Sequence, residues 1–375
     1  MSAGGIEIAG AAMTAFGRFE DRSVIDLGVE AVRAALRDAG DPTFTAAFCG
    51  TAYSGVAAGH RVLGRLGRTG MPIIDVEAGC ASGAAALSMA SMAIASGEVD
   101  CALVFGMEKM PKGMIRSSFF EPWQEQAGLT PAPAYFALRA QRLMRERGIT
   151  KNDLAAVVVK NRANGARNDL AMFRKEVTAD EVLASRVVCE PLHLWMLCSP
   201  NEGAAAVVLR RSDRGVQLRA ARVSSHLPGS VLAESTPLSG VVDDDRIPSP
   251  TQRAASWAYE AAGLGADDVD VVECQDTDAA RELLAYEELG LCEPGEQPKL
   301  LAGGAVALGG ARPVNPSGGL LSKGEPLGAS AVGQVVELTD QLRGRAGTRQ
   351  VEGARVGLCH TIGRGANASV VLLSG

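Results

Sequence analysis

The sequence predicts an α/β protein made of two similar halves, and two observations support this. Short apolar runs alternate with alanine-rich segments of helical periodicity along the 375 residues, which is typical of α/β proteins. The run GAAAVVLRRS from Gly203 resembles GANASVVLLSG from Gly365, and each follows a glycine-rich segment that leads into a helix. A sequence that repeats its architecture once indicates two halves around a pseudo-twofold axis. We place these halves at residues 1–215 and 216–375.

The first half opens with a predicted helix over residues 23–39. Its apolar residues recur at helical spacing from Ile25 to Leu36, and Gly40 ends it. The run CALVF at residues 101–105 has the composition of a buried strand.

A second buried strand, GAAAVVL, is predicted at residues 203–209. Residues 117–194 separate the two strands. This stretch is polar and charged, and it contains a predicted helix at 135–147. We interpret it as an insertion into the first half.

The segment IIDVEAGCASGAAALSMASMAIASG places a cysteine between a strand and a helix. Residues 73–76 are expected to end a strand, Gly79 allows a sharp turn, and the helix after Cys80 ends at Gly97. A helix N-terminus favours a thiolate through its dipole and its free backbone N–H groups. The amide of Cys80 could also point at a developing oxyanion. We therefore predict that Cys80 is a nucleophile; the alternative is a buried structural cysteine.

Composition argues against several other classes of function. The net charge is −6 with no long block of one sign, which argues against nucleic-acid binding. The eight cysteines form no C-x-x-C pair, so we expect neither a metal site nor a redox motif. No uninterrupted apolar stretch has membrane-spanning length, and the N-terminus lacks the features of a signal peptide. We expect a cytoplasmic protein without membrane insertion.

Four separated blocks of the chain form a recognisable series. They are the cysteine segment with its GEVD and GMEKM endings, FRKEVTADEVLASRVVCEPLHLWMLCSPNEGAAAVVL, VVECQDTDAARELLAYEELGLCEPGE and NPSGGLLSKGEPLGAS. In content and order they resemble the thiolase superfamily, in particular its sterol-carrier-protein (lipid-transfer-protein-like) branch. The resemblance covers nearly the whole chain.

This resemblance implies a thiolase fold, in which two repeated halves form a five-layered α/β/α/β/α sandwich. Residues 117–194 would be the loop domain that helps to hold CoA. The resemblance also implies a homodimer, acyl-CoA substrates and no cofactor other than CoA as substrate or product. In the family a cysteine, here Cys80, takes the acyl group, and a second base moves a proton at the α-carbon.

The family's G-H-P motif reads Gly324-Glu325-Pro326 in this chain. An ionised Glu325 would accept hydrogen bonds only and would oppose a nearby thiolate or enolate. A carboxyl whose pKa is raised by burial could instead donate as a neutral acid. A structural or solvated carboxylate is the third possibility. Glu325 is thus a candidate catalytic residue in an altered acid/base set.

The family's H-D-C-F position reads Gln275-Asp276-Thr277-Asp278. Gln275 is a candidate for holding a water molecule or an oxyanion. Thr277 is a poor general base and a weak candidate for substrate binding. Structural roles for both residues remain open.

The run CHTIG at residues 359–363 stands where the family has a C-x-G or H-N-x-G motif. The register is ambiguous by one residue, so His360 is the predicted base and Cys359 a second candidate. The alternative is that His360 is a core histidine. Gly363 matches a glycine whose amide lies near the nucleophile, so Cys80 and Gly363 are the predicted oxyanion hole.

Three basic residues of the inserted stretch are weak candidates for contacts with CoA phosphates. They are Lys160, Arg162 and Arg167. The alternative is a solvated charged face.

Three functions from different classes fit these observations. The first is an acyl-CoA acyltransferase of lipid metabolism that forms an acyl-Cys80 intermediate. The second is a retro-aldolase that cleaves a β-hydroxyacyl-CoA without covalent chemistry, together with a small OB-fold partner bearing a zinc ribbon. The third is a non-catalytic partner subunit. We favour the first, because the turn around Cys80 is intact.

Overall fold

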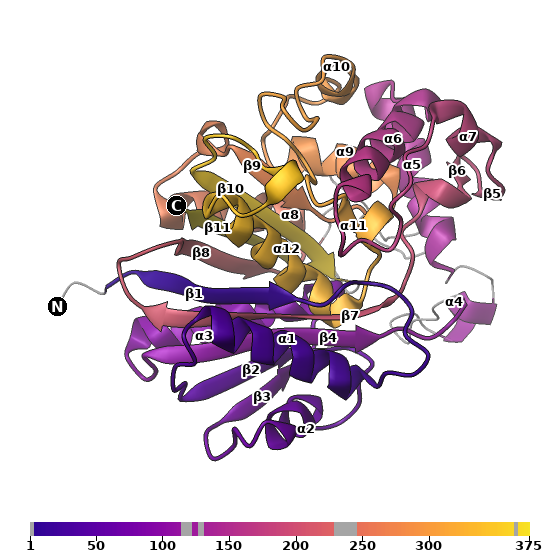
Figure 1. The fold of residues 1–375 in the computed structure, drawn as a ribbon. Coiled ribbons are helices and arrows are strands. Elements are labelled where there is room, and N and C mark those ends of the chain that lie inside the picture. The colour runs from indigo at the N-terminus through magenta and orange to yellow at the C-terminus, as the bar shows by residue number, and fades with distance from the viewer. Residues whose placement is uncertain (1–3, 114–121, 127–130, 229–245, 364–366) are drawn as a thin grey trace.

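Two sets of strands with the same order form the centre of the molecule (Figure 1). The computed structural model describes residues 4–113, 122–126, 131–228, 246–363 and 367–375. The first half contains β1 (Ile6–Met13), α1 (Val24–Asp38), β2 (Ala46–Gly50), α2 (Ala58–Arg65), β3 (Ile73–Val76), α3 (Ser82–Ser96), β4 (Cys101–Lys109) and β7 (Glu202–Arg211). The second half contains β8 (Gln217–Ser224), α8 (Pro250–Ala262), β9 (Val271–Cys274), α9 (Ala279–Glu288), α10 (Gln297–Ala302), α11 (Gly319–Lys323), α12 (Leu327–Leu342), β10 (Val356–Gly363) and β11 (Asn367–Ser374).

The strand order confirms the internal repeat. The sheet runs β3-β2-β4-β7-β1-β8-β11-β10-β9, and β1 meets β8 through the pairing of Glu7 with Gln217. Read inward from its own edge, the second half has the order β9-β10-β11-β8, which matches β2-β4-β7-β1 of the first. The place of β3 is taken by Val314, which forms a parallel bridge to Val272 of β9. The repeated runs at 203 and 365 belong to the equivalent strands β7 and β11.

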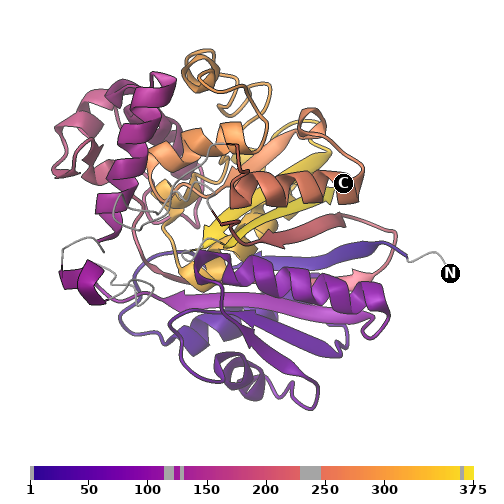
Figure 2. The ribbon, with the colours of Figure 1, turned by 180° about the vertical axis from the view of Figure 1, so that it is seen from behind.

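Helices cover both faces of each set of strands, which produces the five layers. α1 and α2 pack on the outer face of the first half, where Leu27 meets Phe105 in one core cluster. α3 and α12 lie between the two sets of strands and share a second cluster through Leu87 and Val335. α8 and α9 cover the outer face of the second half with residues such as Leu283. Seen from behind, α3 crosses the face of the first half's strands (Figure 2).

The predicted elements agree with local sequence signals. α1 begins after a capping box in which Ser23 and Asp26 satisfy each other's backbone N–H groups. α3 ends at Gly97, whose φ of 86° closes the helix. The segment Gly79–Ser96 is apolar and long enough to cross a membrane by composition, yet half of it is buried inside the protein. It is a core helix between the two sets of strands, and such a helix is apolar on more than one face.

The inserted region lies between β4 and β7 in the sequence and packs against the second half. It contains α4 (Pro122–Gln126), α5 (Ala132–Arg147), α6 (Lys151–Ala166), α7 (Ala179–Ala184), β5 (Val187–Cys189) and β6 (Leu192–His193). α5 and α6 pack against α9, and α6 also contacts α11. In Figure 1, α5, α6, α7, β5 and β6 gather on the side of α9, away from β3, whereas α4 lies apart from them. Of the predicted insertion at 117–194, residues 117–121 and 127–130 lie outside the described residues, and the rest belongs to this region.

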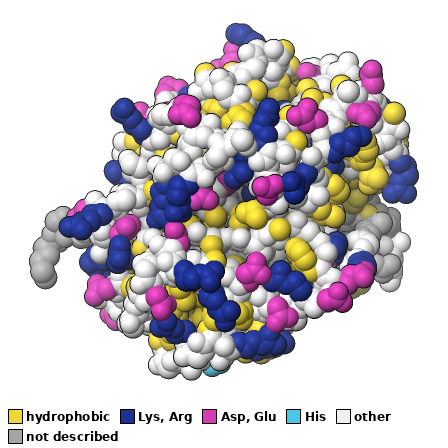
Figure 3. Space-filling model, in the orientation of Figure 1, with side chains coloured by type: hydrophobic (Ala, Val, Ile, Leu, Met, Phe, Trp, Pro, Cys, Tyr) yellow, Lys and Arg dark blue, Asp and Glu magenta, His cyan; other side chains and the backbone are white. Residues whose placement is uncertain are grey.

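Single-turn 3-10 helices complete the fold, at Gly79–Ala81, Leu194–Met196, Ala266–Asp268 and Gly347–Arg349. Charged side chains of both signs are interspersed over the face shown in Figure 3.

Candidate active site

Cys80 lies in the one-turn helix Gly79–Ala81, directly before α3. Gly79 has a φ of 60°, the conformation that the predicted sharp turn needs. The Ser82 hydroxyl accepts the Ala78 N–H at 2.9 Å and donates to the Gly79 carbonyl at 2.6 Å. α3 begins without a side-chain cap, so the positive end of its dipole faces the thiol region.

Gly363, at the end of β10, packs directly on this turn. A Cβ atom at this position would lie 2.0 Å from the carbonyl oxygen of Ala78 and 3.2 Å from the amide nitrogen of Ala81. Only glycine fits so close to another backbone. The structure thus brings Gly363 to the residues that flank Cys80, as the sequence predicted for its position.

Glu325 is the predicted acid/base residue that contacts Cys80. Its carboxylate accepts hydrogen bonds from the thiol of Cys80, from Cys198 Sγ at 3.1 Å and from Gln275 Nε2 at 2.9 Å. The side chain is buried, and burial raises the pKa of Glu325 although the three hydrogen bonds oppose this shift. Glu325 is therefore neither a solvated carboxylate nor remote from Cys80.

The backbone around Glu325 is fixed by the segment before β7. Its N–H donates to the Ser199 carbonyl at 2.9 Å, and residues 200 and 325 form a parallel bridge. Cys198 belongs to the same segment, and its N–H donates to the Thr277 carbonyl at 2.9 Å. Burial, followed by the charge of Glu325, raises the pKa of the Cys198 thiol well above its usual value. Cys198 is thus a thiol donor rather than a thiolate.

Gln275 follows β9 and is held in one orientation. Its side-chain carbonyl accepts the Ile362 N–H, while its amide group donates to Glu325. The backbone of β10 therefore sets the direction in which Gln275 supports the carboxylate.

His360 and Cys359 lie away from the nucleophile. His360 Nε2 is 3.0 Å from Thr251 Oγ1 of α8, and its Nδ1 is buried without a partner among the described residues. Burial, followed by the charge of Arg281, lowers the pKa of His360 well below its usual value. Cys359 belongs to the core between the sheets, where burial raises its pKa. Neither side chain is among the described residues that line the cavity of Cys80.

A cavity of about 960 Å³ opens onto Cys80. Its inner wall includes the side chains of Cys80, Glu325, Gln275, Thr277 and Cys198. The inserted region supplies the opposite wall, with Tyr135, Phe136, Arg139, Arg162, Phe173 and Trp195. No histidine lines this cavity in the described part of the chain.

The three basic residues predicted to contact CoA phosphates do not line the same cavity. Arg162 lines the cavity of Cys80. Lys160 instead forms an ion pair with Glu282 at 3.0 Å, and Arg167 donates to the Ala163 carbonyl of its own helix. Lys160 and Arg167 share a different flank of α6, around a smaller cavity. Their predicted contact with the same CoA as Arg162 is therefore not supported by their placement.

Thr277 lies in the wall beside a buried ion pair. Its hydroxyl donates to Asp278 Oδ2 at 3.3 Å, and Asp278 is paired with Arg139. Within the described residues, no group of three or more His, Cys, Asp or Glu side chains is placed to hold a metal ion.

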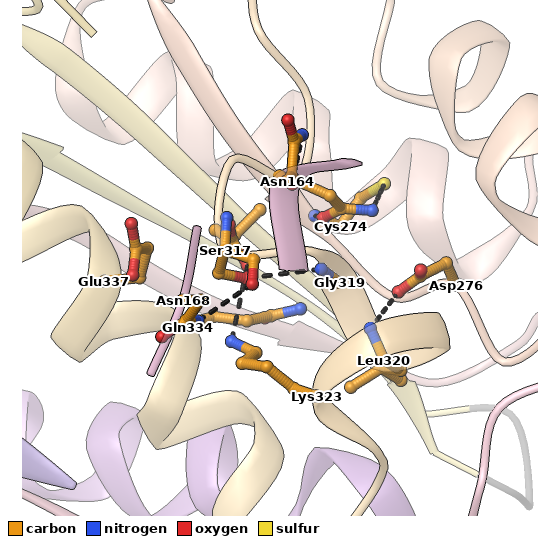
Figure 4. A network of polar contacts seen from close by, with 12 residues as sticks. Asn164, Asn168, Cys274, Asp276, Ser317, Gly319, Leu320, Lys323, Gln334 and Glu337 are labelled. Atoms are coloured by element: carbon orange, nitrogen blue, oxygen red, sulfur yellow. Dashed lines mark hydrogen bonds and ion pairs between the residues drawn. The ribbon is translucent and has the colours of Figure 1, made fainter. Parts of the chain in front are cut away.

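A buried polar network supports the connection that carries Glu325 (Figure 4). Asp276 accepts the N–H groups of Leu320 at 2.6 Å and Leu321 at 3.2 Å, at the start of α11. Burial, followed by the charge of Glu282, raises the pKa of Asp276 well above its usual value. On the other side of α11, Lys323 Nζ lies 3.6 Å from the carboxylate of Glu273.

Two residues that contribute to the site were not identified from the sequence. Cys198 was counted only as one of several scattered thiols; its place before a predicted strand was the one available signal. Glu108, in the GMEKM block, accepts the N–H groups of Ala52 at 2.8 Å, Tyr53 at 3.0 Å and Gly328 at 3.3 Å. It joins the cavity wall to the first turn of α12.

Comparison with known proteins agrees with this architecture. Residues 6–213 match the thiolase N-terminal domain, and residues 238–375 match the thiolase C-terminal domain-like family. The chain is 38% identical to acetyl-CoA acetyltransferase of Methanothermobacter thermautotrophicus, covering 98% of this chain and 99% of that protein. It is 36% identical to sterol carrier protein 2 of Bos taurus (97% of this chain, 71% of that protein). It is 37% identical to benzoylsuccinyl-CoA thiolase subunit BbsB of Thauera aromatica (97% and 96%).

Solved structures show the same fold. The "Ltp2-ChsH2(DUF35) aldolase" superposes with a TM-score of 0.87 at 24% identity, covering 100% of this chain and 99% of that chain. Human mitochondrial 3-ketoacyl-CoA thiolase in complex with CoA gives a TM-score of 0.74 at 17% identity, with coverage of 100% and 98%. The repeated half-sheets, the cysteine before α3 and the two matched domains lead to one conclusion: this chain belongs to the thiolase family of acyltransferases.

Proposed function

We propose that this protein transfers an acyl group from an acyl-CoA thioester through Cys80, with Glu325 as the base. The observation that carries the proposal is the hydrogen bond from the Cys80 thiol to a buried carboxylate, inside a cavity lined by the inserted region. The relatives named acetyl-CoA acetyltransferase and sterol carrier protein 2 support acyl-CoA as the substrate and lipid metabolism as its setting.

The contacts support a defined order of proton and bond changes. Glu325 takes the thiol proton as Cys80 Sγ attacks the thioester carbonyl. The carbon–sulfur bond to CoA then breaks, and the departing CoA thiolate takes the proton back from Glu325. A carboxylate with a raised pKa is a stronger base than an exposed one, so burial of Glu325 favours the first step. The amides of Cys80 and Gly363 are the proposed donors to the oxyanion.

The deciding experiment is intact-mass spectrometry after incubation with a panel of acyl-CoAs. We expect the protein to gain the mass of the acyl group, and Cys80→Ala to lose this gain. Cys198→Ala is the matched control, because it removes the other thiol that donates to Glu325 and should still be acylated. Binding of acyl-CoA without any mass gain would contradict acyl transfer through Cys80.

A second candidate function is retro-aldol cleavage, and the presence of the Glu325 carboxyl group in the cavity favours it. The described residues that line the cavity include the carboxyl group of Glu325 and no imidazole. Glu325 would take the proton of a β-hydroxyl group as the Cα–Cβ bond breaks, and would return it to the acyl-CoA enolate. Cleavage of a β-hydroxyacyl-CoA by Cys80→Ala would support this candidate, and its loss in Glu325→Gln would identify the base. The assay includes a small OB-fold zinc-ribbon protein as the proposed partner. The third possibility is a non-catalytic partner subunit. A protein that forms no acyl adduct and cleaves no β-hydroxyacyl-CoA would support it.

We also propose a homodimer formed through the open edge of the first half. β3 is the edge strand of the sheet, and apolar side chains near it are exposed, including Ile74 at 40% and Met92 of α3 at 56%. An unpaired edge with exposed apolar residues favours pairing with a second copy. Sedimentation equilibrium of the protein and of Ile74→Lys tests this, since the substitution should shift the mass toward the monomer.

A further inference from the structure

Arg162 is a buried cation without an anionic partner. The described chain has four buried basic side chains, Arg139, Arg162, Arg281 and Lys323, and Arg162 is 8% exposed. Each of the other three lies within ion-pair distance of a carboxylate, whereas Arg162 has no ion pair with any described residue. Its Nε is fully buried and makes no hydrogen bond in the described structure. Burying an unpaired charge is costly, so an unpaired buried arginine indicates a ligand.

The surroundings of Arg162 hold the guanidinium but leave its edges open. The Phe173 ring centroid lies 4.1 Å from its Cζ, and the Trp195 centroid lies 6.0 Å away. Such contacts use the face of the cation. The N–H groups on the edges form the fork that matches a carboxylate in a bidentate pair. Burial lowers the pKa of Arg162 to about 10, so it still carries its charge at neutral pH.

Arg162 shares its cavity with the reacting groups. Cys80 and Glu325 come from the two repeated halves, while Arg162 comes from α6 of the inserted region, and all three line the same space. Arg186 also lines this cavity but is exposed, which suits the hydrated phosphates of CoA. The buried position of Arg162 suits an anion that enters the cavity with the acyl group.

We propose that Arg162 binds a carboxylate on the acyl group, so that the substrates are CoA thioesters of dicarboxylic acids. This inference rests on the proposed use of the cavity for acyl-CoA. It adds a specificity-determining residue that acts at the acyl end remote from the thioester, where a plain fatty acyl chain would leave the guanidinium buried and unpaired.

The test compares binding of matched acyl-CoAs by the full chain carrying Cys80→Ser, so that no acyl transfer enters the measurement. The pairs have equal chain length: succinyl with butyryl, glutaryl with pentanoyl, and adipoyl with hexanoyl-CoA. Isothermal titration should show at least one dicarboxylic member binding tighter than its partner by about tenfold or more, as expected for a charged hydrogen-bonded pair. Arg162→Met should remove this preference, and Arg162→Lys should weaken it.

The matched control is Arg186→Met, which removes the exposed arginine of the same cavity and should leave the preference intact. Equal affinity within every pair for the unsubstituted Arg162 protein would overturn the proposal. So would an equal loss of both members and of free CoA in Arg162→Met, because Arg162 would then bind a phosphate of CoA. If Arg162→Met fails to fold, a weakened preference in a folded Arg162→Lys protein supports the proposal, and an unchanged preference overturns it. A carboxylate preference without any acyl-Cys80 adduct in the parent protein would uphold Arg162 and reject acyl transfer.

Discussion

The starts of α3 and α12 occupy equivalent places in the two halves of this molecule, yet they carry different chemistry. Each helix follows the position of the third strand of its half, and neither has a side-chain cap. The first carries Cys80 and the second carries Glu325, and the two side chains meet. Repetition of the fold therefore placed two positive helix ends together, with a thiol at one and a carboxyl group at the other, which we propose to be the nucleophile and the base.

The two connections differ in what holds them. In the first half, three residues separate β3 from Cys80, and the hydroxyl of Ser82 closes the turn. In the second half, α11 lies between Val314 and Glu325, and Asp276 holds it through buried hydrogen bonds. The position of Cys80 thus depends on local backbone geometry, whereas the position of Glu325 depends on residues distant in sequence.

The largest expected effect comes from removing the base while keeping its shape. Glu325→Gln should lower turnover by about 10²–10⁴-fold, because the amide cannot accept the proton of Cys80. Binding of acyl-CoA should change little, so kcat falls while Kd is retained. Cys198→Ser is the control, since its hydroxyl can still donate to the carboxylate. Full turnover by Glu325→Gln would place the base elsewhere.

A paired stability measurement compares the two connections directly. Asp276→Ala removes the acceptor of the Leu320 and Leu321 N–H groups, whereas the Asn161 amide keeps its hydrogen bond to Glu282. This substitution should lower the free energy of unfolding by roughly 3 kcal/mol. Ser82→Ala removes the hydrogen bonds of one hydroxyl and should cost about 1 kcal/mol. Urea unfolding of both variants gives the two values. A larger loss for Ser82→Ala would reverse the comparison.

The smallest expected effect concerns His360, which lies away from both helix ends. Its pKa is lowered in the folded protein, so below about pH 6.5 the unfolded chain binds a proton that the folded protein does not. Its contribution therefore favours folding above pH 6.5 and is lost as the pH falls. The raised pKa of Glu325 acts in the opposite sense, because stability falls as the pH rises above the unfolded value.

His360→Gln should consequently flatten the decline in unfolding free energy between pH 6.5 and pH 5, by up to about 1.4 kcal/mol per pH unit. Turnover should persist, because His360 contacts Thr251 rather than the nucleophile. Loss of all turnover in a folded His360→Gln protein would show that His360 takes part in catalysis.

Local features of the site could be predicted from the sequence. The strand, the turn at Gly79, the position of Cys80 and the end of α3 follow from neighbouring residues. The repeat was visible because β7 and β11 have similar sequences. Glu325 and Gln275 were identified as candidates from their places in family motifs, and the structure puts both in contact with one another.

Contacts that depend on tertiary packing could not be predicted. Cys198 and Glu325 are 127 positions apart, so their hydrogen bond has no local signature. The sequence predicts His360 as the base with a register that is ambiguous by one residue, and a shift of one residue along β10 changes which side of the sheet a side chain faces. Likewise, Lys160 and Arg162 are two positions apart on α6, and only the packing of that helix decides which of them reaches the cavity.

The shared carboxylate has a consequence for chemical labelling of the site. Cys80 and Cys198 both donate to Glu325, so one acceptor serves two thiols. Alkylation of either sulfur removes a donor from the carboxylate and changes how strongly it attracts the remaining thiol proton. We therefore expect the rate at which one cysteine is alkylated to depend on whether the other is already alkylated.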